Sequence, residues 1–177
     1  MTILILFSVI VVGDRRLLRF LRGNHYDIEL CAKMVRNFLQ WRLDNKVDAV
    51  RQDIVYGGKD SPYKFPNGKL IIDLAPQIII STNATDYNGR PMCLEQYNFS
   101  PKEVFKAVSI EDYLIFLTYT LEYRSLVMEQ FSNDKELEYL AAHPNEADRV
   151  DGYGVVIMDF TIRDLKGLFF YLCVLIN

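Results

Sequence analysis

Apolar positions in the first third of the chain recur with a helical period. Leu17, Leu18, Phe20 and Leu21 form a short apolar face, and the Gly-Asn pair at positions 23–24 is typical of a helix end. After Asp27, a favoured N-cap residue, apolar side chains repeat at helical spacing at Leu30, Met34, Phe38 and Trp41. The pattern predicts a helical hairpin, with Trp41 as a core anchor.

The pattern changes in the middle of the chain. The stretch 57–68, "GGKDSPYKFPNG", is dense in Gly and Pro and is the best candidate for a linker. Two strands are predicted after it, over Gln77–Ser81 and Pro91–Tyr97. Asn88-Gly89 between them is a strong hairpin signal.

A long helix and a buried strand are predicted next. Ser109 followed by Asp112 resembles a capping box and should open a helix that runs to about Phe131. Residues 133–151 are polar and predict a loop, whereas 153–160, "YGVVIMDF", is a continuous apolar run. Such runs are typical of strands covered on both faces. The order of elements predicts an α/β fold entered through a helical module.

Composition narrows the function. The 177 residues carry 20 basic and 23 acidic side chains, so no overall basic field favours nucleic acid. Three widely spaced cysteines and two histidines predict neither a disulfide framework nor a metal site, and favour a reducing, cytoplasmic compartment. Asp159 and Asp164 follow the buried strand without a phosphate loop or nucleophile elbow. We therefore expect no catalytic residues, no cofactor and no enzyme.

Both ends are apolar. Residues 1–12, "MTILILFSVIVV", are too short for a membrane span of about 20 residues and lack the basic region of a signal peptide. Residues 168–177, "LFFYLCVLIN", carry no terminating signal. We interpret the chain as truncated, with a buried segment or an artefactual start at its N-terminus.

Three motifs, in order, carry a family resemblance. They are "LLRFLRGNHYD" with "WR" at 41–42, "TDYNGRPMCLEQY", and "VVIMDFTIRDLKGL". Together they resemble the Sec14-like (CRAL-TRIO) lipid-binding proteins over about residues 14–168. The resemblance implies a helical N-terminal module over 14–56 and part of a lipid-binding domain over 69–177, an incomplete α/β/α domain with a mixed sheet.

The chain departs from the family pattern in two motifs. Members that handle phosphoinositides carry Arg-Lys where this chain has Asn24 and His25, so recognition of the inositol phosphate does not carry over. The family turn "IMDLKG" is here stretched by the residues between Asp159 and Asp164. Family members also continue past this turn into further strands and the helix that gates the pocket.

The candidate lipid site lies on the long helix and the strands. Tyr113, Phe116, Leu117, Thr120 and Tyr123 form an apolar stripe with a few hydroxyls, which suits a lipid pocket and equally suits an ordinary helix-on-sheet core. The resemblance places Tyr123 near the head group. The candidate lipid-binding residues are Cys93, Phe116, Leu117, Thr120, Tyr123, Val156 and Met158.

The resemblance implies binding of a lipid or small lipophile and its transfer between membranes, with a phospholipid favoured and sterol-, tocopherol- or retinoid-like ligands as alternatives. We expect a monomeric cytoplasmic protein that associates peripherally with membranes. Arginines 15, 16, 19 and 22 could contact lipid phosphates, but a solvated helix face is favoured. The alternative functions are a membrane-targeting or regulatory interaction module, or a truncated product without a closed pocket.

Overall fold

A computed structural model describes residues 13–87, 90–96, 100–143 and 155–159. The chain divides into two compact units, Met1–Gln52 and Asp53–Asn177, and each is described by itself. Among the described residues, no helix combines the length and the apolar composition that crossing a membrane requires.

The first unit is a helical hairpin, as predicted. Helix α2 (Asp14–Gly23) ends at the expected glycine, and His25 and Tyr26 reverse the chain with φ of 52° and 64°. The amide of Tyr26 donates to the carbonyl of Leu21 at 2.7 Å. Helix α3 (Ile28–Asp44) follows the predicted N-cap residue, Asp27. The amide of Leu30 donates to Oδ1 of Asp27 at 2.9 Å. Capping satisfies an amide that has no partner within the helix.

The hairpin packs around Phe38. Its ring lies 5.5 Å from the ring of Phe20, and the guanidinium groups of Arg16 and Arg42 lie 5.6 and 5.5 Å from its centroid. Trp41, predicted as a core anchor, is 46% exposed, whereas Arg42 is 2% exposed. The prediction about Trp41 is therefore wrong.

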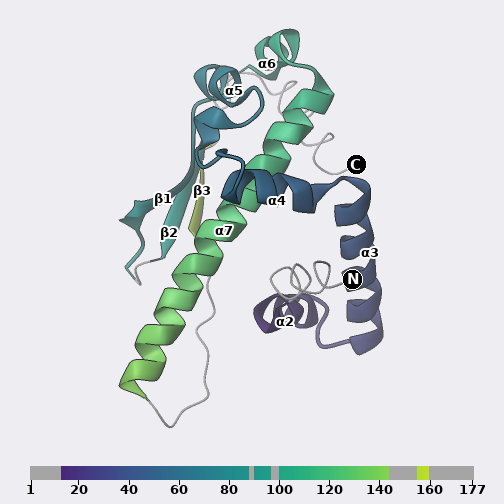
Figure 1. Ribbon diagram of the computed structural model, residues 1–177, viewed down its shortest axis with the longest axis vertical. Helices are drawn as coiled ribbons and strands as arrows, with labels where there is room; N and C mark the ends of the chain where they lie inside the picture. The colour runs from purple at the N-terminus through teal and green to yellow at the C-terminus, as the bar shows by residue number, and fades with distance from the viewer. Residues whose placement is uncertain (1–12, 88–89, 97–99, 144–154, 160–177) are drawn as a thin grey trace. The chain divides into compact units, whose positions relative to one another are not determined.

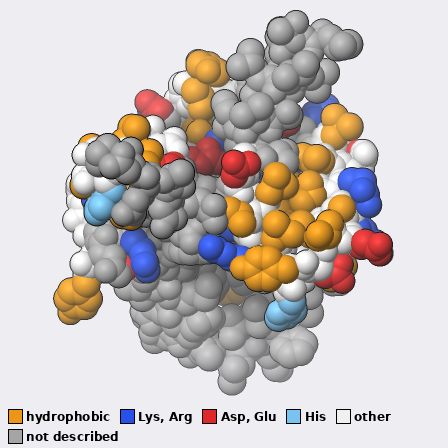
Figure 2. All heavy atoms as spheres, turned by 90° about the horizontal axis from the view of Figure 1, so that it is seen from below, with side chains coloured by type: hydrophobic (Ala, Val, Ile, Leu, Met, Phe, Trp, Pro, Cys, Tyr) orange, Lys and Arg blue, Asp and Glu red, His pale blue; other side chains and the backbone are white. Residues whose placement is uncertain are grey.

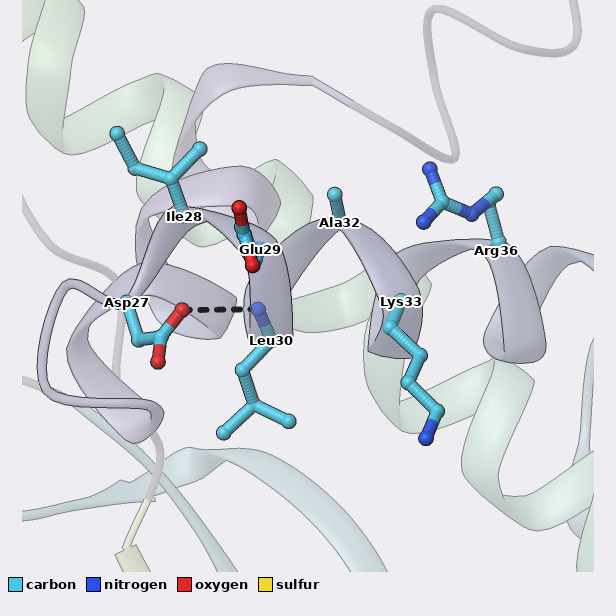
Figure 3. A pocket seen from close by; sticks show the side chains of 7 residues that line it. All are labelled: Asp27, Ile28, Glu29, Leu30, Ala32, Lys33 and Arg36. Atoms are coloured by element: carbon cyan, nitrogen blue, oxygen red, sulfur yellow. Dashed lines mark hydrogen bonds between the residues drawn. The ribbon is translucent and has the colours of Figure 1, made fainter.

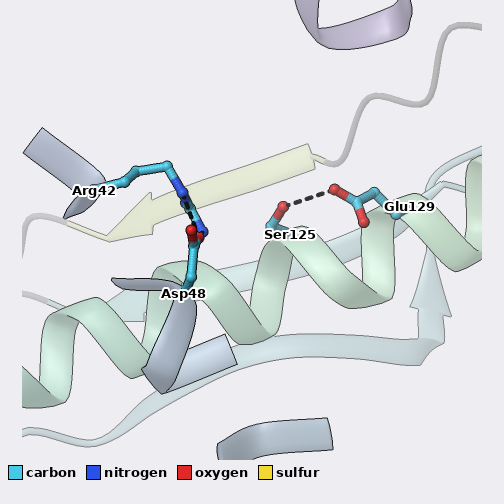
Figure 4. A network of polar contacts seen from close by, with 4 residues as sticks. All are labelled: Arg42, Asp48, Ser125 and Glu129. Atoms are coloured by element: carbon cyan, nitrogen blue, oxygen red, sulfur yellow. Dashed lines mark hydrogen bonds and ion pairs between the residues drawn. The ribbon is translucent and has the colours of Figure 1, made fainter. Parts of the chain in front are cut away.

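Asp48 supplies the physical reason for the burial of Arg42. Nε of Arg42 donates to Oδ1 of Asp48 at 2.9 Å, and Nη2 reaches the same oxygen (Figure 4). Asp48 lies in the first turn of helix α4 (Val47–Val55). A guanidinium can enter an interior once its charge is paired and hydrogen-bonded, and Asp48 meets this requirement in part for Arg42.

The segment predicted as a linker belongs to the second unit. It contains the short 3-10 helix η1 (Pro62–Lys64) and leads into α5 (Gly68–Leu74). Phe65 is 3% exposed. A Cβ atom on Gly68 would overlap the carbonyl oxygen of Pro62, so this glycine permits a close backbone approach. Gly68, which counted toward the linker prediction, is therefore a residue required by tight packing.

A three-stranded sheet follows, and the predicted hairpin is confirmed. Strands β1 (Gln77–Thr85) and β2 (Pro91–Gln96) are antiparallel, and β2 pairs in parallel with β3 (Val155–Asp159). The amide of Arg90 donates to Oδ1 of Asp86 at 2.8 Å, which closes the turn. Residues 88–89, on which the turn prediction was based, lie outside the described part of the chain.

Helices α6 (Pro101–Ala107) and α7 (Ile110–Ala142) complete the described residues. In Figure 1, α7 runs diagonally beside the sheet, with α5 and α6 near its N-terminal end, and it contacts β1. The prediction of a loop from Asn133 is wrong as far as Ala142, and the rest of that loop lies outside the described residues. Pairs such as Lys135 with Glu138, at 2.6 Å, support the extra turns.

The helices and the small sheet confirm the α/β character of the chain. Three short helices, α4, α5 and α6, were not predicted. The α/β/α layering and the limits of the two domains stay predictions.

Candidate functional site

The candidate site is built on one side of α7. Tyr113, Phe116 and Thr120 are 2%, 0% and 2% exposed, and their spacing of three and four residues places them along one stripe. Leu117 and Tyr123, on the same side, are half-buried. The stripe predicted from the sequence therefore exists as a buried surface.

Aromatic rings enclose this stripe. The ring of Phe65 lies 6.3, 5.3 and 5.7 Å from those of Phe116, Tyr119 and Tyr123. Near the start of α7, Tyr113 meets Phe105 of α6 edge-on at 5.2 Å. Ring separations of this size are typical of stabilising aromatic pairs. Phe116 is fully enclosed and contacts Phe65 and Tyr113, a burial that both the core and the lipid-pocket interpretations of the sequence require.

The strands bring the other candidates into register. Cys93 on β2 is 4% exposed and lies opposite Val156 on β3, while Met158 lies opposite Glu95. The side chains of Val156 and Met158 are outside the described set. The structure thus makes Cys93 and Val156 backbone neighbours on adjacent strands.

Sequence reasoning missed a polar pair at the edge of the stripe. The hydroxyl of Tyr119 donates to Oδ2 of Asp53, the two oxygens being 2.5 Å apart. Burial of the ring, followed by this hydrogen bond, raises the pKa of Tyr119 to about 12. Tyr119 could have been found as a neighbour of Phe116 and Tyr123 on the helix, but nothing local to Asp53 indicates its partner.

Two polar pairs on separate units are drawn in Figure 4. Besides Arg42 with Asp48, the hydroxyl of Ser125 on α7 donates to Oε1 of Glu129 at 3.2 Å. Ser125 and Glu129 lie one turn apart on the same helix. Hydrogen bonds between residues four positions apart support a helix from within.

A shallow hollow lies on α3 of the first unit. Figure 3 shows its lining, which comes from a single stretch of α3 and its cap: Asp27, Ile28, Glu29, Leu30, Ala32, Lys33 and Arg36. Lipid and drug-like sites enclose most of the ligand surface, whereas a wall made by one helix leaves a ligand open to water. This hollow does not fit a lipid.

Helix α3 nevertheless exposes apolar side chains. Ile28 and Leu43 are 75% and 71% exposed, and Leu30 and Met34 are more than 40% exposed. Figure 2 shows hydrophobic side chains gathered on one face beside Lys, Arg, Asp and Glu. Among the described residues, no group of three or more His, Cys, Asp or Glu could hold a metal ion.

Comparison with known proteins finds several Sec14 proteins that are similar to this chain. No family model matches the chain. The SEC14 cytosolic factor of Eremothecium gossypii is 31% identical over 158 residues, which is 89% of this chain and 42% of the relative. The Sec14 cytosolic factor of Schizosaccharomyces pombe is 27% identical over 158 residues, which is 89% of this chain and 46% of the relative.

A phosphatidylinositol/phosphatidylcholine transfer protein of Arabidopsis thaliana is 28% identical over 100 residues, 55% of this chain and 15% of the relative. The chain thus spans less than half the length of each of these relatives. Over the matched residues the chain is therefore similar to the Sec14 proteins, as its three motifs indicate.

Proposed function

We propose that this chain takes part in binding a lipid and transferring it between membranes, with a phospholipid as the favoured class. The observation that carries the proposal is the match over 89% of the chain to proteins named SEC14 cytosolic factor. The name of the Arabidopsis relative adds phosphatidylinositol and phosphatidylcholine as lipids that a similar protein transfers. Transfer requires no bond to be made or broken, so the proposed activity is non-enzymatic.

The proposed lipid surface combines the α7 stripe with β2 and β3. It comprises Cys93, Phe116, Leu117, Thr120, Tyr123, Val156 and Met158. Burial of an acyl chain contributes about 0.8 kcal/mol per methylene, so an apolar wall with few polar groups is enough for tight binding. Leu117 and Tyr123 are half-buried and are the members most able to meet a ligand without repacking of the core.

The proposed cycle has three stages. The protein docks on a membrane surface from the cytoplasm as a monomer, exchanges one lipid, and carries it away from water. Acyl chains are expelled by water, so enclosure by apolar side chains provides the driving force. The protein supplies shape and apolar area, together with a few hydroxyl groups that orient the head.

A transfer assay tests the proposal. The full chain is incubated with donor vesicles that contain fluorescent phosphatidylcholine and with unlabelled acceptor vesicles, and the movement of the label is followed. We expect transfer by the native chain, a large loss in Leu117→Glu, and little change in Leu137→Glu. Leu137 lies on the same helix and is 67% exposed, so it controls for the added charge.

Two results would contradict lipid transfer. Vesicle binding without any movement of the label would favour the interaction module. If the chain neither binds vesicles nor moves the label, and an organic extract of the purified protein contains no lipid, then the chain does not bind or transfer lipids.

A further inference from the structure

Thr120 is a buried hydroxyl that no described residue satisfies. Its side chain lies within the α7 stripe and is 2% exposed, and its Oγ1 atom has no hydrogen-bond partner among the described residues. A hydroxyl removed from water without a partner is unfavourable. Valine, an apolar side chain of the same shape, would avoid that cost. The presence of a hydroxyl at this position therefore requires an explanation.

Other hydroxyls on the same helix do find partners. Oγ1 of Thr118 donates to the carbonyl of Leu114 at 2.9 Å, and Oγ of Ser132 donates to the carbonyl of Met128 at 2.7 Å. Both bonds reach the residue four positions earlier, a common solution for Ser and Thr in helices. The hydroxyl of Thr120 does not take this local solution and remains available to a group from outside the helix.

The surroundings of Thr120 define the chemistry of that group. Phe116 lies one turn before it and Tyr123 one turn after it, and both contact the ring of Phe65. Arg124, which is half-buried, lies four residues after Thr120 on the same helix. A buried hydroxyl on a helix face lined by aromatic rings suits an acceptor oxygen attached to an otherwise apolar molecule.

We propose that the hydroxyl of Thr120 donates a hydrogen bond to an acceptor oxygen of the bound lipid, either an ester carbonyl or a phosphodiester oxygen. Thr120 then selects glycerolipids over lipophiles that lack such an oxygen. This inference rests on the proposed lipid binding and adds the class of ligand that the site prefers.

The test replaces the hydroxyl with a methyl group of the same size. The Thr120→Val variant of the full chain is compared with the native chain and with Thr118→Val. The hydroxyl of Thr118 donates to the carbonyl of Leu114 on the same helix. Three probes are titrated: fluorescent phosphatidylcholine, fluorescent diacylglycerol, and the hydrocarbon diphenylhexatriene. Loss of one net hydrogen bond corresponds to about a tenfold weaker affinity.

We expect Thr120→Val to bind phosphatidylcholine about tenfold more weakly, to bind diphenylhexatriene unchanged, and to melt no lower than the native chain without lipid. Thr118→Val should bind all three probes as the native chain does. An equal loss with diacylglycerol identifies the ester carbonyl, and a loss confined to phosphatidylcholine identifies the phosphate oxygen.

Other outcomes overturn the inference. Unchanged phosphatidylcholine affinity, or an equal loss for the hydrocarbon, makes Thr120 a packing residue. A lower melting temperature without lipid shows that the hydroxyl already has a partner inside the protein. If the native chain binds none of the three probes, the proposed function itself fails and this inference fails with it.

Discussion

The hydrogen bond between Tyr119 and Asp53 joins residues 66 positions apart in the chain. It joins Asp53, near the end of α4, to the first third of α7, beside the stripe that carries the candidate lipid residues. The tyrosine ring is 8% exposed and packs on Phe65 at 5.3 Å. The pair therefore holds this side of α7 against Asp53 and Phe65.

This pair makes stability depend on alkaline pH. Burial and the Asp53 hydrogen bond raise the pKa of Tyr119 to about 12 from an ordinary value of 10.0, so folding favours the protonated phenol. The extra stability is fully present below pH 10 and declines as the pH rises toward 12. We expect Tyr119→Phe to lower the free energy of unfolding by about 1–2 kcal/mol near neutral pH.

Urea unfolding of both proteins between pH 7 and pH 11.5 measures the effect. The difference in stability between native chain and Tyr119→Phe should be constant up to about pH 10 and shrink above it. Tyr56→Phe is the matched control, since Tyr56 is 82% exposed. A difference that stays the same up to pH 11.5 would exclude this role for the Tyr119 proton.

Single residues also show where the sequence pattern misled. The helical period grouped Trp41 with Phe38, but Phe38 packs on Phe20 while Trp41 stays 46% exposed. Arg42 is buried instead, through its pair with Asp48. Hydrophobicity alone assigns an arginine to solvent, and only knowledge of the partner on the next helix reverses that assignment.

Helix α7 shows what the pattern predicts well at the level of elements. Its start was predicted from Ser109, and the amide of Asp112 does donate to Oγ of Ser109, at 3.1 Å. Its end was not predicted, because polar residues after Asn133 resemble a loop. A polar helix needs support from pairs along its surface, and Gln130 with Asp134, at 2.8 Å, is such a pair.

The cap of α7 gives a prediction at this scale. Ser109→Ala removes the acceptor of the Asp112 amide and should lower the free energy of unfolding by about 1 kcal/mol. Ser100→Ala is the matched control, because Ser100 precedes α6 without making a side-chain cap hydrogen bond. Thermal melts monitored by circular dichroism compare the two. Equal melting temperatures for the two variants would show that the Ser109 cap does not contribute.

Short elements escaped prediction for a physical reason. Helices α4, α5 and α6 span seven to nine residues, which is shorter than the window of about 11–18 residues in which a helical period is distinct. Contacts with another element contribute to holding them, as Phe105 of α6 does by packing on Tyr113 of α7. The candidate stripe was predictable from α7 alone, while its wall, Phe65, lies in a segment that resembled a linker.

Charge is distributed unevenly over the whole molecule. Residues 1–52 carry nine Lys and Arg against five Asp and Glu, and residues 53–177 carry eleven against eighteen. The formal net charge of −3 therefore conceals a basic first unit. An anionic membrane repels the chain as a whole but attracts this unit locally, within a distance set by the salt concentration.

Docking on a membrane should therefore depend on exposed bases of the first unit. Lys33 and Arg36 are exposed on α3, and each basic residue near an anionic surface contributes about 1 kcal/mol. We expect the double variant Lys33→Gln, Arg36→Gln to bind phosphatidylserine-containing vesicles about thirtyfold more weakly in dilute buffer. The difference should diminish as added salt shortens the screening length.

Vesicle flotation at low and high salt measures this effect. The pair Lys102 and Lys106, exposed on α6 of the second unit, provides a control double variant with the same loss of charge. If both double variants lose binding equally, net charge governs docking and the first unit has no special part in it. If only the α3 variant loses binding, and only at low salt, the basic unit is the part of the molecule that meets the membrane.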